Sequence, residues 1–120
     1  MKNKWSTRLI DPTHLIRIAR GDQQRLLKYL KQFQELIPRR TAALRKSLQA
    51  GDRKMVRQHV HQMSAQLQFF GIPGIVEPIR RLEDEYEQMP MKEMTSLVMG
   101  ILKKTDQALA EVTSLINLQF

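Results

Sequence analysis

The sequence predicts an all-α protein, an antiparallel up-and-down four-helix bundle with a short N-terminal capping helix. Apolar residues recur at spacings of three and four through four long segments, and no segment alternates with the period of a strand. The connections between segments are short, which makes consecutive helices antiparallel neighbours. A chain of 120 residues suffices for one domain with a buried core. We therefore expect one helical domain over 11–120, preceded by a polar arm at 1–10.

Capping residues mark the first two helices. Asp11 and Pro12 begin a short helix that ends at Gly21, because aspartate caps free backbone amides and proline is tolerated in the first turn. A longer helix is expected over 22–49. Pro38 lies inside it and predicts a bend, since an interior proline removes one backbone hydrogen bond.

The later helices follow the same signals. Asp52 caps the third helix, Gly71 ends it, and Pro73 is expected to begin the fourth. A final helix follows Pro90. The expected inward positions of the third helix are Met55, Val56, Val60, Met63, Leu67 and Phe70.

Composition restricts the compartment and the partners. The chain has no cysteine, which excludes disulfides and thiolate chemistry and fits a reducing compartment. Its apolar runs are too short to cross a bilayer, and no signal peptide pattern follows the first basic residues, so we expect a cytoplasmic protein without membrane contact. No long heptad seam is present, which makes a monomer the default.

The net charge favours anionic partners. Twenty basic and twelve acidic residues give a formal charge of +8 at pH 7. The basic residues are spread along the chain, and no finger or aromatic RNA-binding signature accompanies them. A basic nucleic-acid-binding helical module therefore remains the least favoured alternative.

Several kinds of catalytic site are disfavoured by spacing. His59 and His61 lie two positions apart, so on a helix they point about 200° apart and cannot share a metal ion. The acidic run at 83–87 is expected to be a solvated helix face. Neither a serine or cysteine nucleophile with an adjacent base nor a phosphate-binding loop is present. We expect no metal site, no cofactor of its own, and no free-standing enzyme.

His61 is the candidate for chemistry. It lies one residue after an inward position, at the flank of the apolar stripe, and should be at least partly exposed. Arg57, Ser64, Ala65 and Gln68 share its face of the helix. Imidazole is the side chain that is partly neutral and nucleophilic near neutral pH. A histidine at such a flank is more often a plain surface residue, so position alone does not assign a role.

The order of features over 11–86 resembles the histidine-containing phosphotransfer (HPt) domain of two-component phosphorelays. That family carries the motif His-x-Leu-Lys-Gly, with a further glycine ten residues after the histidine, and a Leu-Glu pair on the following helix. The same frame here gives His61, Met63 for the leucine, Ser64 for the lysine, Ala65 for the glycine, Gly71 at the tenth place, and Arg81-Leu82-Glu83 on the next helix. The resemblance covers about two thirds of the chain.

The resemblance implies a phosphorelay intermediate. His61 would accept a phosphoryl group on Nε2 from a receiver-domain aspartate, of a response regulator or a hybrid histidine kinase, and pass it to another receiver. Glu83 would accept a hydrogen bond from Nδ1. Ala65, Gln68 and Gly71 would lie against the docked receiver, which would bring Mg²⁺ with it.

Ser64 is the main departure from the family. The family's lysine helps to neutralise the phosphoryl oxygens, whereas serine offers a neutral hydroxyl. Arg57, one turn before His61, is expected to supply the charge, so that Arg57→Ala should slow phosphotransfer more than Arg45→Ala. The alternative is a degenerate HPt-like adaptor or inhibitor that binds a receiver or kinase without being phosphorylated.

Overall fold

The computed structural model describes residues 9–120, apart from the side chain of Gln119. Five helices and no strand occur within this range, so the all-α prediction is confirmed. The helices are α1 (Pro12–Ile18), α2 (Gln23–Gln49), α3 (Arg53–Phe69), α4 (Val76–Glu85) and α5 (Met91–Gln119). The expected polar arm lies outside the described residues, except for Leu9 and Ile10.

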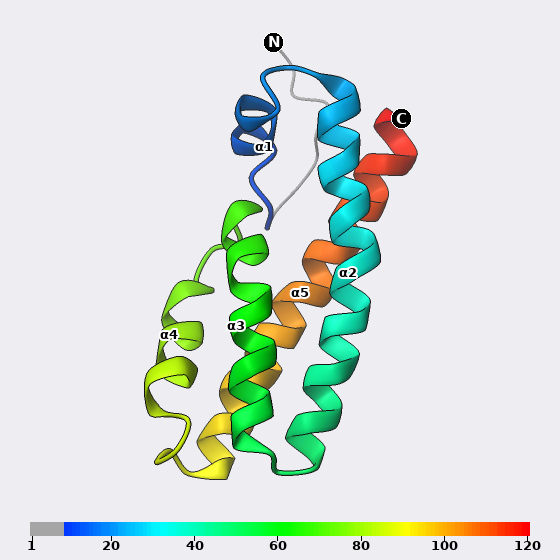
Figure 1. Cartoon of the computed structure of the whole chain (residues 1–120). Coiled ribbons are helices and arrows are strands. Elements are labelled where there is room, and N and C mark those ends of the chain that lie inside the picture. The colour runs from blue at the N-terminus through cyan, green and yellow to red at the C-terminus, as the bar shows by residue number, and fades with distance from the viewer. Residues whose placement is uncertain (1–8) are drawn as a thin grey trace.

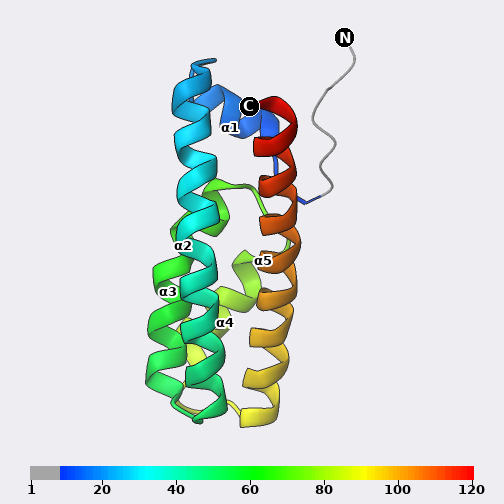
Figure 2. The same ribbon diagram turned by 90° about the vertical axis from the view of Figure 1, so that its right-hand side faces the viewer.

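The helices pack lengthwise into a body of 49 × 22 × 20 Å. In Figure 1 the chain descends through α2, returns through α3, descends through α4 and returns through α5. Figure 2 shows α2 and α5 side by side, with α1 at the same end of the molecule as the last turns of α5. Of the helices in the described range, none is both long and apolar enough to cross a membrane.

Aspartate caps begin the first three helices. Asp11, Asp22 and Asp52 each accept a hydrogen bond from a backbone amide in the first turn of the helix that follows. The sequence predicts all three starts correctly. Helix α2 continues through Pro38 and ends before Gly51, which has a φ of +67°.

The predicted start of the fourth helix is wrong. Helix α4 begins at Val76 instead of Pro73, because Gly74 has a φ of +70° and turns the chain before the helix can form. Ile75, which precedes the first turn, is fully buried and anchors the connection in the core. The helix ends at Glu85.

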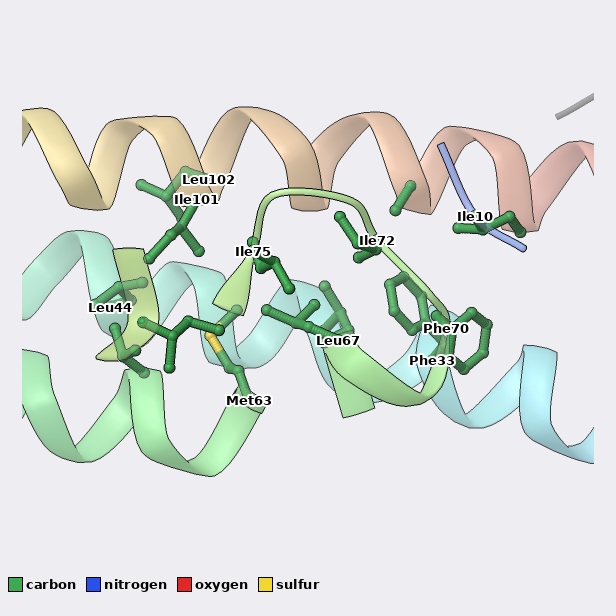
Figure 3. Packing of buried hydrophobic residues seen from close by; sticks show 14 of the residues in the cluster. Ile10, Phe33, Leu44, Met63, Leu67, Phe70, Ile72, Ile75, Ile101 and Leu102 are labelled. Carbon is green, nitrogen blue, oxygen red and sulfur yellow. The ribbon is translucent and has the colours of Figure 1, made fainter. Parts of the chain in front are cut away.

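The core runs along the axis of the molecule. Figure 3 shows side chains from α2, α3 and α5 meeting those of the α3–α4 connection, with Phe33 against Phe70 and Ile72 and Ile75 reaching inward. The ring centroids of Phe33 and Phe70 are 4.3 Å apart, and both rings are buried. The predicted inward positions of α3 are buried except Met55, which is only half-buried.

The segment before α1 is bound to α5. The backbone amides of Leu9 and Ile10 donate to the carboxylate of Glu111 at 3.0–3.1 Å, and the Ile10 side chain is buried. The next amide, that of Asp11, donates to the carbonyl of Phe70 at 3.0 Å. The start of the domain therefore joins the last helix to the end of α3.

Candidate functional site

His61 projects from the middle of α3 beside α4. Its side chain is 64% exposed, and Nδ1 lies 3.4 Å from Oε1 of Glu83, whose side chain is 24% exposed. The structure thus brings together the two residues that the sequence analysis paired, from positions 22 residues apart. The roles of these two residues stay predictions.

The contact determines what the imidazole can do. A carboxylate beside Nδ1 favours the tautomer that carries its proton there, and the lone pair then resides on Nε2. The same carboxylate would stabilise positive charge on the ring if Nε2 formed a bond. Because most of the side chain is exposed, a second protein can reach the ring.

Two arginines of α3, Arg57 and Arg53, donate hydrogen bonds to backbone carbonyls at and just beyond the end of α4. Arg57 Nε donates to the backbone carbonyl of Glu83 at 3.4 Å, and its guanidinium lies 5.5 Å from the centre of the Tyr86 ring. Arg53 donates to the carbonyls of Tyr86, at 2.9 Å, and Met89. The last carbonyls of a helix have no partner within it and attract cations. Arg57 therefore holds the backbone of the residue whose carboxylate faces His61.

A groove of about 360 Å³ continues the site between α3 and α4. Ser64 and Gln68 line it from α3, and Gln68 Nε2 donates to Ser64 Oγ at 2.8 Å. Arg80 and Glu83 line it from α4, together with Val76, which is 43% exposed. The groove therefore reaches Glu83 along the face of α3 that carries His61.

Ala65 belongs to a different hollow, on the α2 side of α3. This apolar pocket of about 330 Å³ is also lined by Tyr29, Phe69 and Phe70. The rings of Tyr29 and Phe69 pack edge to face with centroids 5.3 Å apart. Neither Tyr29 nor Phe69 is among the site residues predicted from the sequence. The adjacent Phe69 and Phe70 could have indicated this pocket. Two neighbouring residues of a helix cannot both face the core, so one of the two rings has to lie at the surface.

Gly71 is required by the chain itself. Its φ is +68°, and a Cβ there would lie 2.7 Å from Cβ of Asp11. Asp11 is held in place by its backbone hydrogen bond to Phe70. The need for glycine is thus explained by the contact with the segment before α1, and its role in docking a receiver stays a prediction.

Comparisons with models of protein families, with curated proteins and with solved structures found no match. The resemblance to the HPt family therefore rests on the motif frame within 11–86. What the site can do chemically rests on the contacts around His61.

His59 and His61 lie on opposite edges of α3. His59 lines a groove of about 260 Å³ toward α2, with Arg40 and Gln62, whose side chains are joined by a hydrogen bond of 3.0 Å. His61 faces α4. Across residues 9–120, no group of three His, Asp or Glu side chains is placed to hold a metal ion.

Helix α4 is also joined to α5 through Arg81. This guanidinium hydrogen-bonds to Glu93 of α5 and to Glu85 of α4, at 3.3 Å for the latter. The bond to Glu93, followed by that to Glu85, raises the pKa of Arg81 above its ordinary value. The neighbouring Leu82 is fully buried. These contacts fix the turn of α4 that presents Glu83.

Proposed function

We propose that this protein is a phosphorelay intermediate built as an antiparallel four-helix bundle of the HPt type. It accepts a phosphoryl group on His61 from the aspartyl phosphate of a receiver domain and passes it to a second receiver. The observation that carries the proposal is an exposed imidazole whose Nδ1 faces the carboxylate of Glu83 at 3.4 Å.

The transfer needs one nucleophile from this chain. The Nε2 lone pair of His61 forms the N–P bond while the bond between phosphorus and the aspartate oxygen breaks, and the aspartate leaves as a carboxylate with that electron pair. The proton stays on Nδ1, so the ring becomes cationic. The carboxylate of Glu83 stabilises this charge, and the reverse sequence returns the phosphoryl group to the next receiver.

The receiver contributes the remaining chemistry. In the proposed complex the receiver holds the Mg²⁺ and the residues that neutralise the transferred group. This protein then needs to contribute only a positioned imidazole. The net charge of +8 favours association with the acidic phosphoacceptor side of such a partner. We propose that the protein works as a monomer in the cytoplasm.

The test is incubation with receiver domains phosphorylated by acetyl phosphate, followed by intact mass measurement at neutral pH. The wild-type chain should gain one phosphoryl group, which acid removes. His61→Gln should abolish the gain and leave the helical content and thermal unfolding unchanged. His59→Gln is the matched control, because His59 is on the same helix but faces α2, and it should be labelled normally.

Two outcomes would contradict the proposal. One is equal labelling of wild type and His61→Gln. The other is receiver binding that survives His61→Gln with no labelling of the wild-type chain by any receiver of the panel. The second outcome would support the degenerate adaptor instead, for which the neutral Ser64 in the groove is the relevant observation.

A further inference from the structure

A phosphoryl group on His61 would enter a neighbourhood that already carries negative charge. Glu83 faces the ring at 3.4 Å, and both Glu83 and Asp84 line the adjoining groove. Phosphoryl oxygens beside carboxylates repel one another, and the repulsion is strong where water is partly excluded. The site therefore needs a cation that can reach the phosphoryl oxygens from this side.

Two nearby groups on α3 do not meet this need. Ser64 is neutral, and its oxygen already accepts a hydrogen bond from Gln68 at 2.8 Å. Arg57 is half-buried, and its guanidinium is committed to the carbonyl of Glu83 and the ring of Tyr86. Moving Arg57 to the phosphoryl group would give up its hydrogen bond to the carbonyl of Glu83 and leave Arg53 as the cation at the end of α4.

We infer that Arg80 of α4 binds the phosphoryl group on His61 from across the groove, an inference that rests on the proposed phosphotransfer function. Arg80 precedes Glu83 by three residues, so both side chains lie on one face of α4, and both line the groove opposite Ser64. The guanidinium presents two parallel N–H donors to phosphoryl oxygens. Arg80 thus provides from the neighbouring helix the charge that Ser64 lacks.

Arg80 is available for this task. Its side chain is 61% exposed, and it pairs at 3.4 Å with Glu77, whose side chain is 72% exposed. An exposed pair of this kind contributes little to stability, so exchanging Glu77 for a phosphoryl group costs little. The long, flexible side chain can then swing along the groove toward His61.

The experiment compares Arg80→Ala with Arg39→Ala in phosphotransfer from a phosphorylated receiver. Arg39 is the matched control, because it is also exposed and pairs with a glutamate of its own helix, Glu35, at 3.7 Å, but it lies on α2. Arg80→Ala should reduce the transfer rate and the lifetime of the phosphohistidine about ten- to a hundredfold, the value of a hydrogen bond to a charged group. Arg39→Ala should change neither, and adding Ser64→Lys to Arg80→Ala should restore both.

Binding of the unphosphorylated receiver separates this role from docking. Arg80→Ala should leave that affinity unchanged, because the inferred contact is with the phosphoryl group alone. Equal transfer rates for the two arginine variants, a matching loss of affinity for the unphosphorylated receiver, or no rescue by Ser64→Lys would each overturn the inference. If the wild-type chain accepts no phosphate, the proposed phosphotransfer function itself is wrong. If the wild-type chain is labelled but Arg80→Ala behaves like Arg39→Ala, only the inferred role of Arg80 is wrong.

Discussion

At the scale of single residues, the separation of 3.4 Å between His61 Nδ1 and Glu83 Oε1 is long for a hydrogen bond. Such contacts in the resting state of a site commonly shorten when charge develops. Here the charge would develop on the ring as Nε2 bonds to phosphorus. Glu83 would then contribute more to the transition state than to the resting protein, which is the condition for accelerating the transfer.

Glu83→Ala should therefore slow phosphotransfer more than it affects folding. We expect a rate loss of about ten- to a hundredfold, corresponding to a hydrogen bond to a charged group of about 1.5–3 kcal/mol. The measurement is the initial rate of labelling by a phosphorylated receiver, with Glu87→Ala as control, since Glu87 is exposed and lies beyond the end of α4. A rate equal to that of the control would remove Glu83 from the mechanism.

Some of this site can be predicted from the sequence. The position of His61 beside an inward residue predicts its exposure, and helical spacing places Ser64 and Gln68 together. The hydrogen bond from Arg57 to the carbonyl of Glu83 and the place of Arg80 opposite Ser64 cannot be predicted in this way. They depend on which turn of α4 lies opposite each residue of α3, and that register is set by packing between helices.

At the scale of the elements, two glycines with almost the same φ angle have different surroundings. Gly71 follows α3 with a φ of +68°, and Gly51 follows α2 with a φ of +67°. A Cβ on Gly71 would lie 2.7 Å from Cβ of Asp11, whereas one on Gly51 would meet nothing within 4 Å. The pair therefore separates the conformational need for glycine from the steric one.

Gly51→Ala should lower the free energy of unfolding by about 1–2 kcal/mol, the cost of a left-handed conformation for an L-residue. Gly71→Ala should lower it further, because the segment before α1 must also move. Urea denaturation of both variants, monitored by circular dichroism, measures the difference. Equal losses of unfolding free energy would show that Asp11 can move away from the added Cβ without destabilising the protein. The close approach of Asp11 to Gly71 would then not fix the connection between α3 and α1.

The boundaries of the elements were predictable where one signal dominated. An aspartate caps each of the first three helices as expected, at Asp11, Asp22 and Asp52. The start of α4 follows from two conflicting signals one residue apart. Pro73 favours a first helical turn, but Gly74 takes a positive φ, and the burial of Ile75 determines where the helix can begin.

At the scale of the whole molecule, Glu111 connects the two ends of the described chain. Its carboxylate accepts the amides of Leu9 and Ile10, which places Ile10 in the core between α5 and the end of α3. Sequence patterns do not predict such a contact, because its partners are about a hundred positions apart and neither forms a motif. The all-helical architecture, by contrast, follows from local periodicity alone.

Glu111→Ala should destabilise the protein by about 1–3 kcal/mol, because it removes the carboxylate that accepts hydrogen bonds from two partly buried amides. Asp106→Ala on the same helix is the matched control, since it removes an exposed ion pair with Arg45, of 3.0 Å, and should cost about 0–1 kcal/mol. Thermal unfolding of both variants tests this. Losses of equal size would mean that the hydrogen bonds of Glu111 to the N-terminal segment stabilise the fold no more than an exposed ion pair does.

Arg57 bonds to the backbone of Glu83, and the side chain of Glu83 in turn faces His61. Two contacts in series therefore connect Arg57 of α3 to Glu83 of α4, and Glu83 to His61, which lies one turn after Arg57 on α3. If Arg57 acts on His61 only by holding Glu83 in place, Arg57→Ala should slow phosphotransfer in the wild-type chain but not in a Glu83→Ala background. A double-mutant cycle on the transfer rate would then give a coupling free energy about as large as the effect of Arg57→Ala alone. An arginine that resembles a catalytic charge in the sequence would thus act on the histidine through the main chain of its neighbour.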